Sequence, residues 1–414
     1  AKMAAQKLDP ELRKDSNPTD LHSMRACNSI LDVRAQQIQE RSALEAADVI
    51  LKTDTQYVSK LASMKVLVTG AAGYLGKSLI LTLKHLGVSV IGIDVVDIPG
   101  VVDIVGSVSD VKLMKDICID CDVIFNTAAL HAPHATHYHE DEFINVNIGG
   151  IKSILSASSL SQVPKVIIQT STTSLTITEN VKKKEKNGEC VWLDETSSAP
   201  YVISQQKSKN NENTYRIEED EQDKPRNKYG RSKKLAEKLC IETAAATQEL
   251  SIVILRTSRF FCEELLEENN LSLPNAMINE LLGRRSGLVD IITGHIKAMF
   301  RASKLSGNIY VLSSPWPLSQ KETPIHSSKE VSELMATKYK GVYDDIFTIQ
   351  SSSSSLASSL ALRSQQPFIF PDKITRVYDS SAAVRDLDWQ PIWTFDNAVE
   401  RLRNNDPVVL EGIF

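Results

Sequence analysis

The chain of 414 residues lacks the features that mark several classes of protein. No apolar run approaches the roughly 20 residues that a membrane-spanning helix requires, so we expect no membrane span. Six cysteines are too few for a disulfide scaffold in so long a chain, which indicates a reducing compartment. The formal net charge of -5 favours neither nucleic-acid binding nor an acidic tail. The expected class is a soluble enzyme, cytoplasmic or, as an alternative, organellar after processing.

The length predicts two or three folding units, because a domain commonly holds roughly 100 to 200 residues. Residues 1–63 form a polar leader with the composition of neither a signal peptide nor a transit peptide. Apolar residues recur in it at helical spacing and predict an amphipathic helix that is interrupted at Asp54. These apolar residues are Leu44, Ala47, Leu51, Val58 and Leu61. We expect this extension to dock on the body of the protein or on a partner.

A glycine-rich turn follows the first apolar strand, at residues 66–69. Gly70, Gly73 and Gly76 are spaced Gly-x-x-Gly-x-x-Gly, and a helix is predicted over residues 77–86. This order lets the backbone approach a pyrophosphate, which the N-terminus of the helix then attracts. Glycines also occur in ordinary turns between a strand and a helix, so the motif alone leaves both interpretations open.

A second apolar strand, residues 88–94, ends at Asp94. This residue lies roughly 20 positions after the glycines, where a carboxylate accepts a hydrogen bond from the ribose 2'-hydroxyl of a dinucleotide. The same carboxylate would repel a 2'-phosphate. NAD is therefore favoured over NADP.

Further apolar strands alternate with predicted helices along the chain. They cover residues 101–105, 122–126, 165–169 and 251–255, and make six strands with the first two. Alternation of helices with continuous apolar strands predicts an α/β fold with a doubly wound parallel sheet of the Rossmann type.

Two segments differ in composition from the rest. Residues 201–224 carry too few apolar side chains to offset the entropy of ordering, so they are interpreted as a solvent-exposed insertion. The serine-rich run at residues 351–355 indicates a linker, a low-complexity helix or surface filler.

Two groups of residues raise the question of a metal. Cys118 and Cys121 have the spacing of half a zinc site or of a redox pair, but no second pair completes four ligands, so a packed helix end is favoured. Four histidines lie close together in the next segment: His131, His134, His137 and His139. Their spacing fits neither face of a helix, and a substrate-facing loop is favoured over a metal site.

Tyr229 and Lys233 stand four residues apart at the start of a predicted helix, and therefore share one face. The charge of Lys233 would favour the phenolate and lower the pKa of Tyr229 below its ordinary value of about 10. Such a tyrosine can exchange a proton with an alcohol or a carbonyl. Hydroxyl side chains at residues 170–174 follow the fifth strand, where one of them could hold the substrate oxygen.

In this order, the motifs resemble those of an extended short-chain dehydrogenase/reductase of the NAD-dependent epimerase/dehydratase group. The resemblance extends from Met64 to the C-terminus. It rests on residues 69–76, 126–129, 147–150, 229–233, 255–261 and 289–290 before His295, and on residues 385–389, where Asp388 replaces a glycine. It implies an NAD-binding domain over residues 64–259 and a smaller substrate domain over 260–414, some segments of which return to the first. It also makes a homodimer plausible.

The resemblance also implies roles for single residues. Tyr229 is the expected acid/base, Lys233 orients the nicotinamide ribose, Thr172 hydrogen-bonds the reacting oxygen, and hydride passes between substrate and nicotinamide. The residues expected to bind the cofactor are Gly70, Gly73, Tyr74, Leu75, Asp94, Ala128, Ala129, Asn147 and Lys233. Those expected to contact a small-molecule substrate are His131, His134 and Arg259, and no metal is expected.

Some positions depart from the pattern of the group. They are Ser107, Thr176 with Ile177, Thr257 and Gly287. Thr173 and Ser174 also replace the acidic pair of the sugar-nucleotide dehydratases, so dehydration is not expected. The leading hypothesis is an NAD(P)-dependent epimerase or oxidoreductase that acts on a nucleotide-sugar or similar polar alcohol or carbonyl. The alternative is a non-catalytic or weakly catalytic nucleotide-binding subunit of a larger assembly, joined through residues 1–63.

Overall fold

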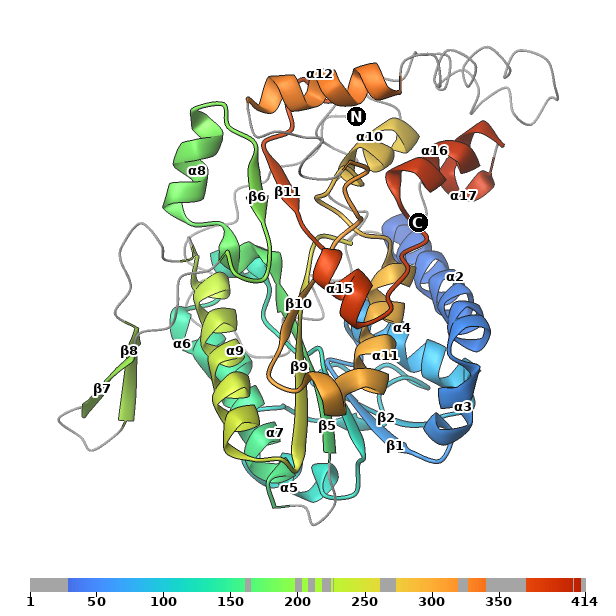
Figure 1. The fold of residues 1–414 in the computed structure, drawn as a ribbon. Coiled ribbons are helices and arrows are strands. Elements are labelled where there is room, and N and C mark those ends of the chain that lie inside the picture. The colour runs from blue at the N-terminus through green and yellow to red at the C-terminus, as the bar shows by residue number, and fades with distance from the viewer. Residues whose placement is uncertain are drawn as a thin grey trace.

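A parallel sheet of seven strands forms the centre of the computed structural model (Figure 1). Its strand order is β10-β9-β5-β4-β1-β2-β3. The strands are β1 (Lys65–Thr69), β2 (Ser89–Asp94), β3 (Ile104–Val105), β4 (Val123–Asn126), β5 (Lys165–Thr172), β9 (Leu250–Thr257) and β10 (Ile309–Leu312). The structure describes residues 29–160, 165–197, 203–207, 213–217, 225, 227–260, 273–318, 327–339, 370–404 and 406–410.

The predicted α/β fold with a doubly wound parallel sheet is confirmed, and all six predicted strands are present. The third strand is shorter than predicted, because the backbone N–H groups of Val101 and Val102 donate to the carbonyl of Ile98 in a turn. The edge strand β10 was not predicted from the sequence. Its four apolar residues form too short a run to be distinguished by pattern from part of a helix.

Helices cover both faces of the sheet. Val66 and Val68 of β1 belong to one apolar cluster, with α4 (Tyr74–His85) and α11 (Leu288–Leu305). Leu67, between them, belongs to the other cluster, with α5 (Val111–Cys118), α7 (Gly150–Ser158) and α9 (Lys228–Ala246). Both faces of the strand are therefore buried, which explains why these strands read as continuous apolar runs.

The extension forms two helices, α2 (Ser29–Thr53) and α3 (Thr55–Leu61), so the predicted interruption at Asp54 is confirmed. α2 packs on α4 and α11. The predicted apolar stripe is partly wrong, because Leu44 is 52% exposed and Leu51 is 43% exposed. The face that packs instead carries mostly small side chains: Ile38, Ala43, Ala46, Ala47 and Ile50. Small residues let two helices approach closely, which a hydrophobicity pattern alone does not reveal.

A buried ion pair fixes the junction of α2 and α3 to α11. Asp54 lies 2.6 Å from Lys297 and 3.4 Å from Arg301, and Asp54 and Lys297 are nearly inaccessible to solvent. Burial raises the pKa of Asp54, but hydrogen bonds from Lys297 and Thr53 outweigh it and the pKa is lowered. Asp388, which replaces the glycine of the group, keeps a left-handed backbone (φ 51°) and pairs with Arg301 at 3.1 Å.

The remaining elements build a smaller part around a second, two-stranded parallel sheet of β6 (Val191–Leu193) and β11 (Arg376–Tyr378). Its helices are α8 (Glu179–Lys186), α10 (Leu273–Glu280), α12 (Ser328–Lys338), α15 (Ser381–Asp386), α16 (Phe395–Arg403) and α17 (Pro407–Leu410). The short helical segments are α6 (Glu140–Phe143), η3 (Ala132–Thr136), η4 (Ile144–Gly149) and η5 (Thr173–Thr176). Among the helices described, none combines the length and apolarity needed to cross a bilayer.

The predicted insertion at residues 201–224 contains an antiparallel pair, β7 (Ile203–Lys207) and β8 (Asn213–Ile217), which the sequence did not reveal. In Figure 1 this hairpin projects beyond α9, away from the central sheet. The serine-rich run at residues 351–355 lies outside the described residues.

Candidate active site

The glycine loop joins β1 to α4 in a tight turn. Gly70 has a positive φ of 70°, and a Cβ atom there would lie 2.7 Å from the backbone nitrogen of Ala128. A Cβ on Gly76 would lie 2.1 Å from the carbonyl oxygen of Gly70. Gly73 caps α4, which begins at Tyr74 and so includes Leu75 in its first turn. The loop therefore needs glycine to fit against the end of β4, and it leads directly into the N-terminus of α4.

Asp94, at the end of β2, is tied to this loop. Its carboxylate accepts hydrogen bonds from the backbone N–H of Ala72 and from that of Val96, both at 3.0 Å. The predicted carboxylate is thus held beside the glycine turn at the carboxyl edge of the sheet.

The chain after β4 is linked to the same loop. Thr127 donates its hydroxyl to the carbonyl of Thr69 at 2.6 Å, and the half-buried Ala128 and Ala129 follow it. Asn147 lies in η4, which is a π-helix, and its side chain bonds both backbone groups of Leu130. The Asn147 amide also donates to the Ser232 hydroxyl on α9 at 2.8 Å. Asn147 therefore connects the β4 loop to the helix that carries Tyr229.

Thr172, Tyr229 and Lys233 come together at the carboxyl end of β5. Asn227 caps α9 by accepting from the N–H of Gly230 at 2.7 Å, which starts the helix just before Tyr229. Thr172 lies near enough to the Tyr229 hydroxyl to lower the pKa of Tyr229. The Lys233 ammonium donates to the carbonyl oxygen of Thr170 at 2.8 Å.

The prediction that the pKa of Tyr229 is lowered is wrong, because the surrounding protein raises this pKa overall. Burial raises the pKa of Tyr229 to about 12, and the neighbouring Thr172 side chain opposes that rise only in part. Lys233 shares the helix face as predicted, but its ammonium is directed to Thr170. Burial lowers the pKa of Lys233 to about 8, and the negative charge of Glu237 opposes this.

A buried ion pair that the sequence analysis missed lies beneath these residues. Glu237 accepts two hydrogen bonds from Arg256, at 3.0 and 2.8 Å, and both side chains are fully buried. Glu237 also accepts from the Ser171 hydroxyl at 2.5 Å. Ser171 stands between Thr170 and Thr172, so the pair fixes the end of the strand. In the sequence, the signal for this ion pair was the position of Glu237, which follows Lys233 by four residues and therefore lies on the same helix face.

Two of the four clustered histidines reach the site. The His131 ring lies 5.8 Å from the Tyr229 ring and 6.0 Å from the His134 ring. His134 accepts a hydrogen bond from the backbone N–H of His131 at 2.9 Å. Burial, and then the charge of Lys233, lower the pKa of His131 to about 3, so its imidazole is neutral near pH 7.

The other two histidines, His137 and His139, are exposed. Within the described ranges, no three His, Cys, Asp or Glu side chains are arranged to hold a metal ion. The interpretation of Cys118 and Cys121 as a packed helix end is confirmed, because both are buried where α5 ends. Burial raises the pKa of Cys118 to about 12 and that of Cys121 to about 11, so neither is a reactive thiolate.

Arg259 is exposed two residues beyond β9, and its backbone pairs with Arg285. Because Thr257 is the register partner of Thr172, Arg259 continues the edge on which the candidate catalytic residues lie.

The departures from the group pattern have local partners. Ser107 and Ser109 share a hydroxyl hydrogen bond of 2.8 Å, and Thr257 donates to the carbonyl of Ser171 at 3.1 Å. A Cβ on Gly287 would lie 2.5 Å from the buried ring of Trp393. Glycine at this position is thus explained by packing.

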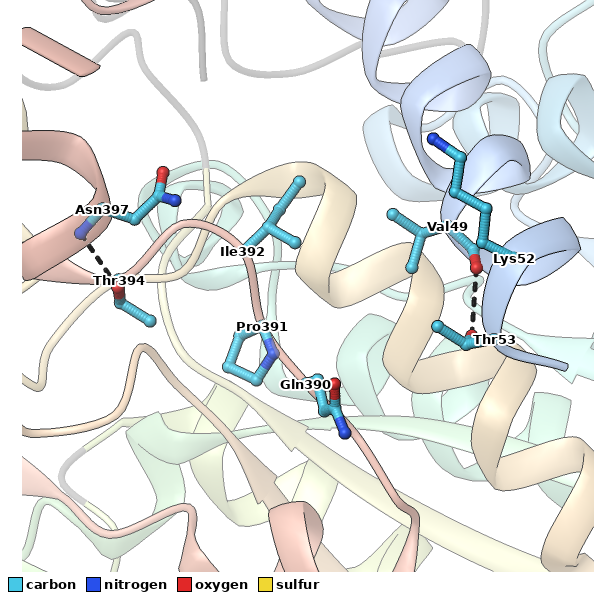
Figure 2. Close-up of a pocket in the computed structure, with 8 residues that line it drawn as sticks. All are labelled: Val49, Lys52, Thr53, Gln390, Pro391, Ile392, Thr394 and Asn397. Carbon is cyan, nitrogen blue, oxygen red and sulfur yellow. Dashed lines mark hydrogen bonds between the residues drawn. The ribbon is translucent and has the colours of Figure 1, made fainter. Parts of the chain in front are cut away.

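A cavity of about 350 Å³ lies between α2 and the segment that leads into α16 (Figure 2). Its lining residues are Val49, Lys52, Thr53, Gln390, Pro391, Ile392, Thr394 and Asn397. None of them is a predicted site residue, so this cavity is separate from the set around Tyr229.

Comparison with known proteins agrees with this geometry. Residues 66–293 match the NAD dependent epimerase/dehydratase family, and this match covers more than half of the chain. The chain belongs to this family. It is an extended member of the short-chain dehydrogenase/reductase superfamily, as the sequence predicts.

Two curated relatives match a shorter region. The chain is 30% identical over 111 residues to the 4-hydroxy-2-methyl-3-oxo-4-farnesyl-3,4-dihydroquinoline-1-oxide ketoreductase of Stigmatella aurantiaca, which covers 25% of this chain and 32% of that protein. It is 29% identical over 114 residues to short-chain dehydrogenase/reductase family 42E member 1 of Xenopus laevis, covering 26% of this chain and 30% of that protein. Each match thus spans about a third of the relative's length.

A solved structure shares the fold. It is a short-chain dehydrogenase/reductase superfamily protein of Agrobacterium tumefaciens with bound NAD, with a TM-score of 0.50 and 17% identity. The superposition covers 82% of this chain and 96% of the Agrobacterium protein.

Proposed function

We propose that this protein is an NAD-dependent oxidoreductase or epimerase that acts on a polar alcohol or carbonyl compound such as a nucleotide-sugar. The observation that carries the proposal is the convergence of Tyr229, Thr172 and Lys233 at the carboxyl end of β5. Ligands of doubly wound sheets bind at this edge. The family match supports the cofactor class, since the family is NAD-dependent.

The glycine loop fits a dinucleotide. Gly70 and Gly73 would let the pyrophosphate approach the backbone, because they carry no side chain, and the backbone N–H of Leu75 in the first turn of α4 would donate to it. Asp94 would accept from the adenosine ribose, and its charge would disfavour a 2'-phosphate. Bound NAD would supply the group that accepts and returns hydride.

Tyr229 and the side chains around it would then donate or accept the proton of the substrate oxygen. With a pKa of about 12, the Tyr229 hydroxyl is protonated near pH 7 and can donate to a substrate carbonyl oxygen. Thr172 can donate a second hydrogen bond to the same oxygen. In the reverse direction the same side chain, as the phenolate, would accept the proton of an alcohol.

The substrate side of the proposal rests on polar groups beyond these two hydroxyls. The neutral His131 and the exposed Arg259 offer a hydrogen-bonding ring and a cation for a polar or anionic substrate. The matched Stigmatella protein is named a ketoreductase, which supports alcohol and ketone chemistry. Thr173 and Ser174 carry no carboxylate, so elimination of water is not part of the proposal.

Purified protein tests the proposal directly. Titration calorimetry with NAD and NADP should show tighter binding of NAD. A panel of nucleotide-sugars and secondary alcohols, followed by NADH absorbance and by product analysis for epimers, should give turnover that Tyr229→Phe abolishes without loss of NAD binding. Unchanged turnover in Tyr229→Phe would refute the assigned role. A homodimer and a subunit role through residues 1–63 stay predictions that native mass can separate.

A further inference from the structure

The N-terminal extension touches the glycine loop through one buried side chain. Gln39, on α2, is 6% exposed, and its amide nitrogen donates to the carbonyl oxygen of Tyr74 at 2.9 Å. Tyr74 directly follows Gly73 and is the first residue of α4. A residue outside the family match at 66–293 thus contacts the helix turn that would face the pyrophosphate.

This hydrogen bond acts on a particular peptide group. The carbonyl of Tyr74 and the N–H of Leu75 belong to the same peptide, and that N–H lies in the first turn of α4, where no intrahelical acceptor exists. A donor on the carbonyl side polarises the peptide and strengthens its N–H as a donor to an anion. The Ser78 hydroxyl also donates to this carbonyl, at 2.8 Å, so the peptide is held from two sides.

The rest of the extension holds Gln39 in place. Its neighbours Ile38, Ser42 and Ala43 are buried, and Thr82 of α4 donates to the carbonyl of Ala43 at 3.3 Å. The other two glutamines in this part of α2, Gln36 and Gln37, are exposed. Gln39 is therefore the glutamine that the packing of α2 directs to the loop.

We propose that Gln39 is a positioning residue of the dinucleotide site and that α2 contributes to cofactor binding through this residue. By fixing the peptide between Tyr74 and Leu75, the extension sets the affinity of the loop for the pyrophosphate of the cofactor. This inference rests on the proposed function, in which NAD binds at the glycine loop.

Two substitutions across the same pair of helices test the inference. Gln39→Met keeps the side-chain length and removes the donor, whereas Thr82→Val removes a contact between α2 and α4 that lies two turns from the loop. On the full chain, titration calorimetry with NAD should give a Kd about three- to tenfold higher in Gln39→Met, the range expected for loss of one hydrogen bond. Thr82→Val should change the Kd less than about twofold, although both variants lower the midpoint of urea unfolding.

A second ligand and a second variant sharpen the result. ADP-ribose keeps the pyrophosphate and lacks the nicotinamide, so its Kd should rise by the same factor in Gln39→Met. Gln39→Asn, which is too short to reach the carbonyl, should reproduce the effect even if the methionine variant folds poorly. Equal Kd values in the wild type, in the Gln39 variants and in Thr82→Val would overturn the inference and leave the proposed function standing. Failure of the wild-type chain to bind NAD would overturn both.

Discussion

Breaking the ion pair between Glu237 and Arg256 should destabilise the fold more than any surface change on α9. Both side chains are fully buried, and two hydrogen bonds of 3.0 and 2.8 Å join them. Glu237→Gln leaves the Arg256 guanidinium buried without a counter-charge, which typically costs about 3–5 kcal/mol. The Ser171 hydroxyl also loses a charged acceptor. We expect a decrease of that size in the free energy of unfolding, measured by urea denaturation followed by circular dichroism.

The same helix provides a matched control. Glu242 pairs with Lys238 at 3.2 Å and its side chain is 59% exposed. Glu242→Gln should therefore lower the free energy of unfolding by less than about 1 kcal/mol. The double variant Glu237→Met with Arg256→Met removes both charges and should recover much of the loss, because an uncompensated charge causes most of it. If Glu237→Gln costs no more than Glu242→Gln, the pair is not the structural base of the site that we describe.

Three further predictions concern other parts of the fold. Gly287→Ala should lower the unfolding free energy by about 1–3 kcal/mol, because the new Cβ would lie 2.5 Å from Trp393; a thermal midpoint equal to that of the wild type would contradict this. Asp54→Asn removes the carboxylate that pairs with buried Lys297 at 2.6 Å, while Asp388 remains 3.8 Å from the same ammonium. The free energy of unfolding should therefore fall by at most about 3–5 kcal/mol, and proteolysis between α2 and α3 should become faster; unchanged cleavage would argue against a fixed extension. Burial lowers the pKa of His295 to about 4, so the unfolded chain binds this proton more tightly and stability falls as the pH drops from about 6.5 towards 4. His295→Gln should flatten that fall in a series of thermal midpoints against pH, and an equally steep fall would show that other groups cause it.

Much of the fold follows from local pattern. The continuous apolar strands and the three glycines predict the central sheet, because both faces of a parallel sheet are buried and only glycine fits the turn after β1. β10 could not be predicted, because its four residues show no hydrophobic periodicity and its position in the sheet depends on pairing with β9.

The packing of the N-terminal extension could be predicted only in part. Leu44 and Leu51 lie at helical spacing but face solvent, since α2 approaches α4 and α11 through a face of alanines together with Ile38 and Ile50. Gln39 could not be recognised in the sequence, because it is one of many polar residues in the extension. Its role depends on a contact with Tyr74, 35 residues away, which only the packing of α2 brings about.

The site shows how far motif reasoning extends. The positions of Tyr229, Lys233 and Thr172 could be predicted from the order of motifs. The pKa of Tyr229 could not, because desolvation depends on the tertiary surroundings and here exceeds the influence of neighbouring groups. Likewise, Glu237 lies at a predictable helix position, but Arg256 and Ser171, which are register partners on β9 and β5, reach it only because α9 packs on these strands.

The function that we propose depends first on the binding of NAD at the glycine loop, beside Tyr229. Titration calorimetry of the wild type, Asp94→Ala and Tyr229→Phe with NAD and NADP tests it most directly. We expect the wild type to bind NAD about tenfold more tightly than NADP, Asp94→Ala to show a smaller preference, and Tyr229→Phe to bind NAD as the wild type does. If the wild-type chain binds neither dinucleotide, the glycine loop is not an NAD site.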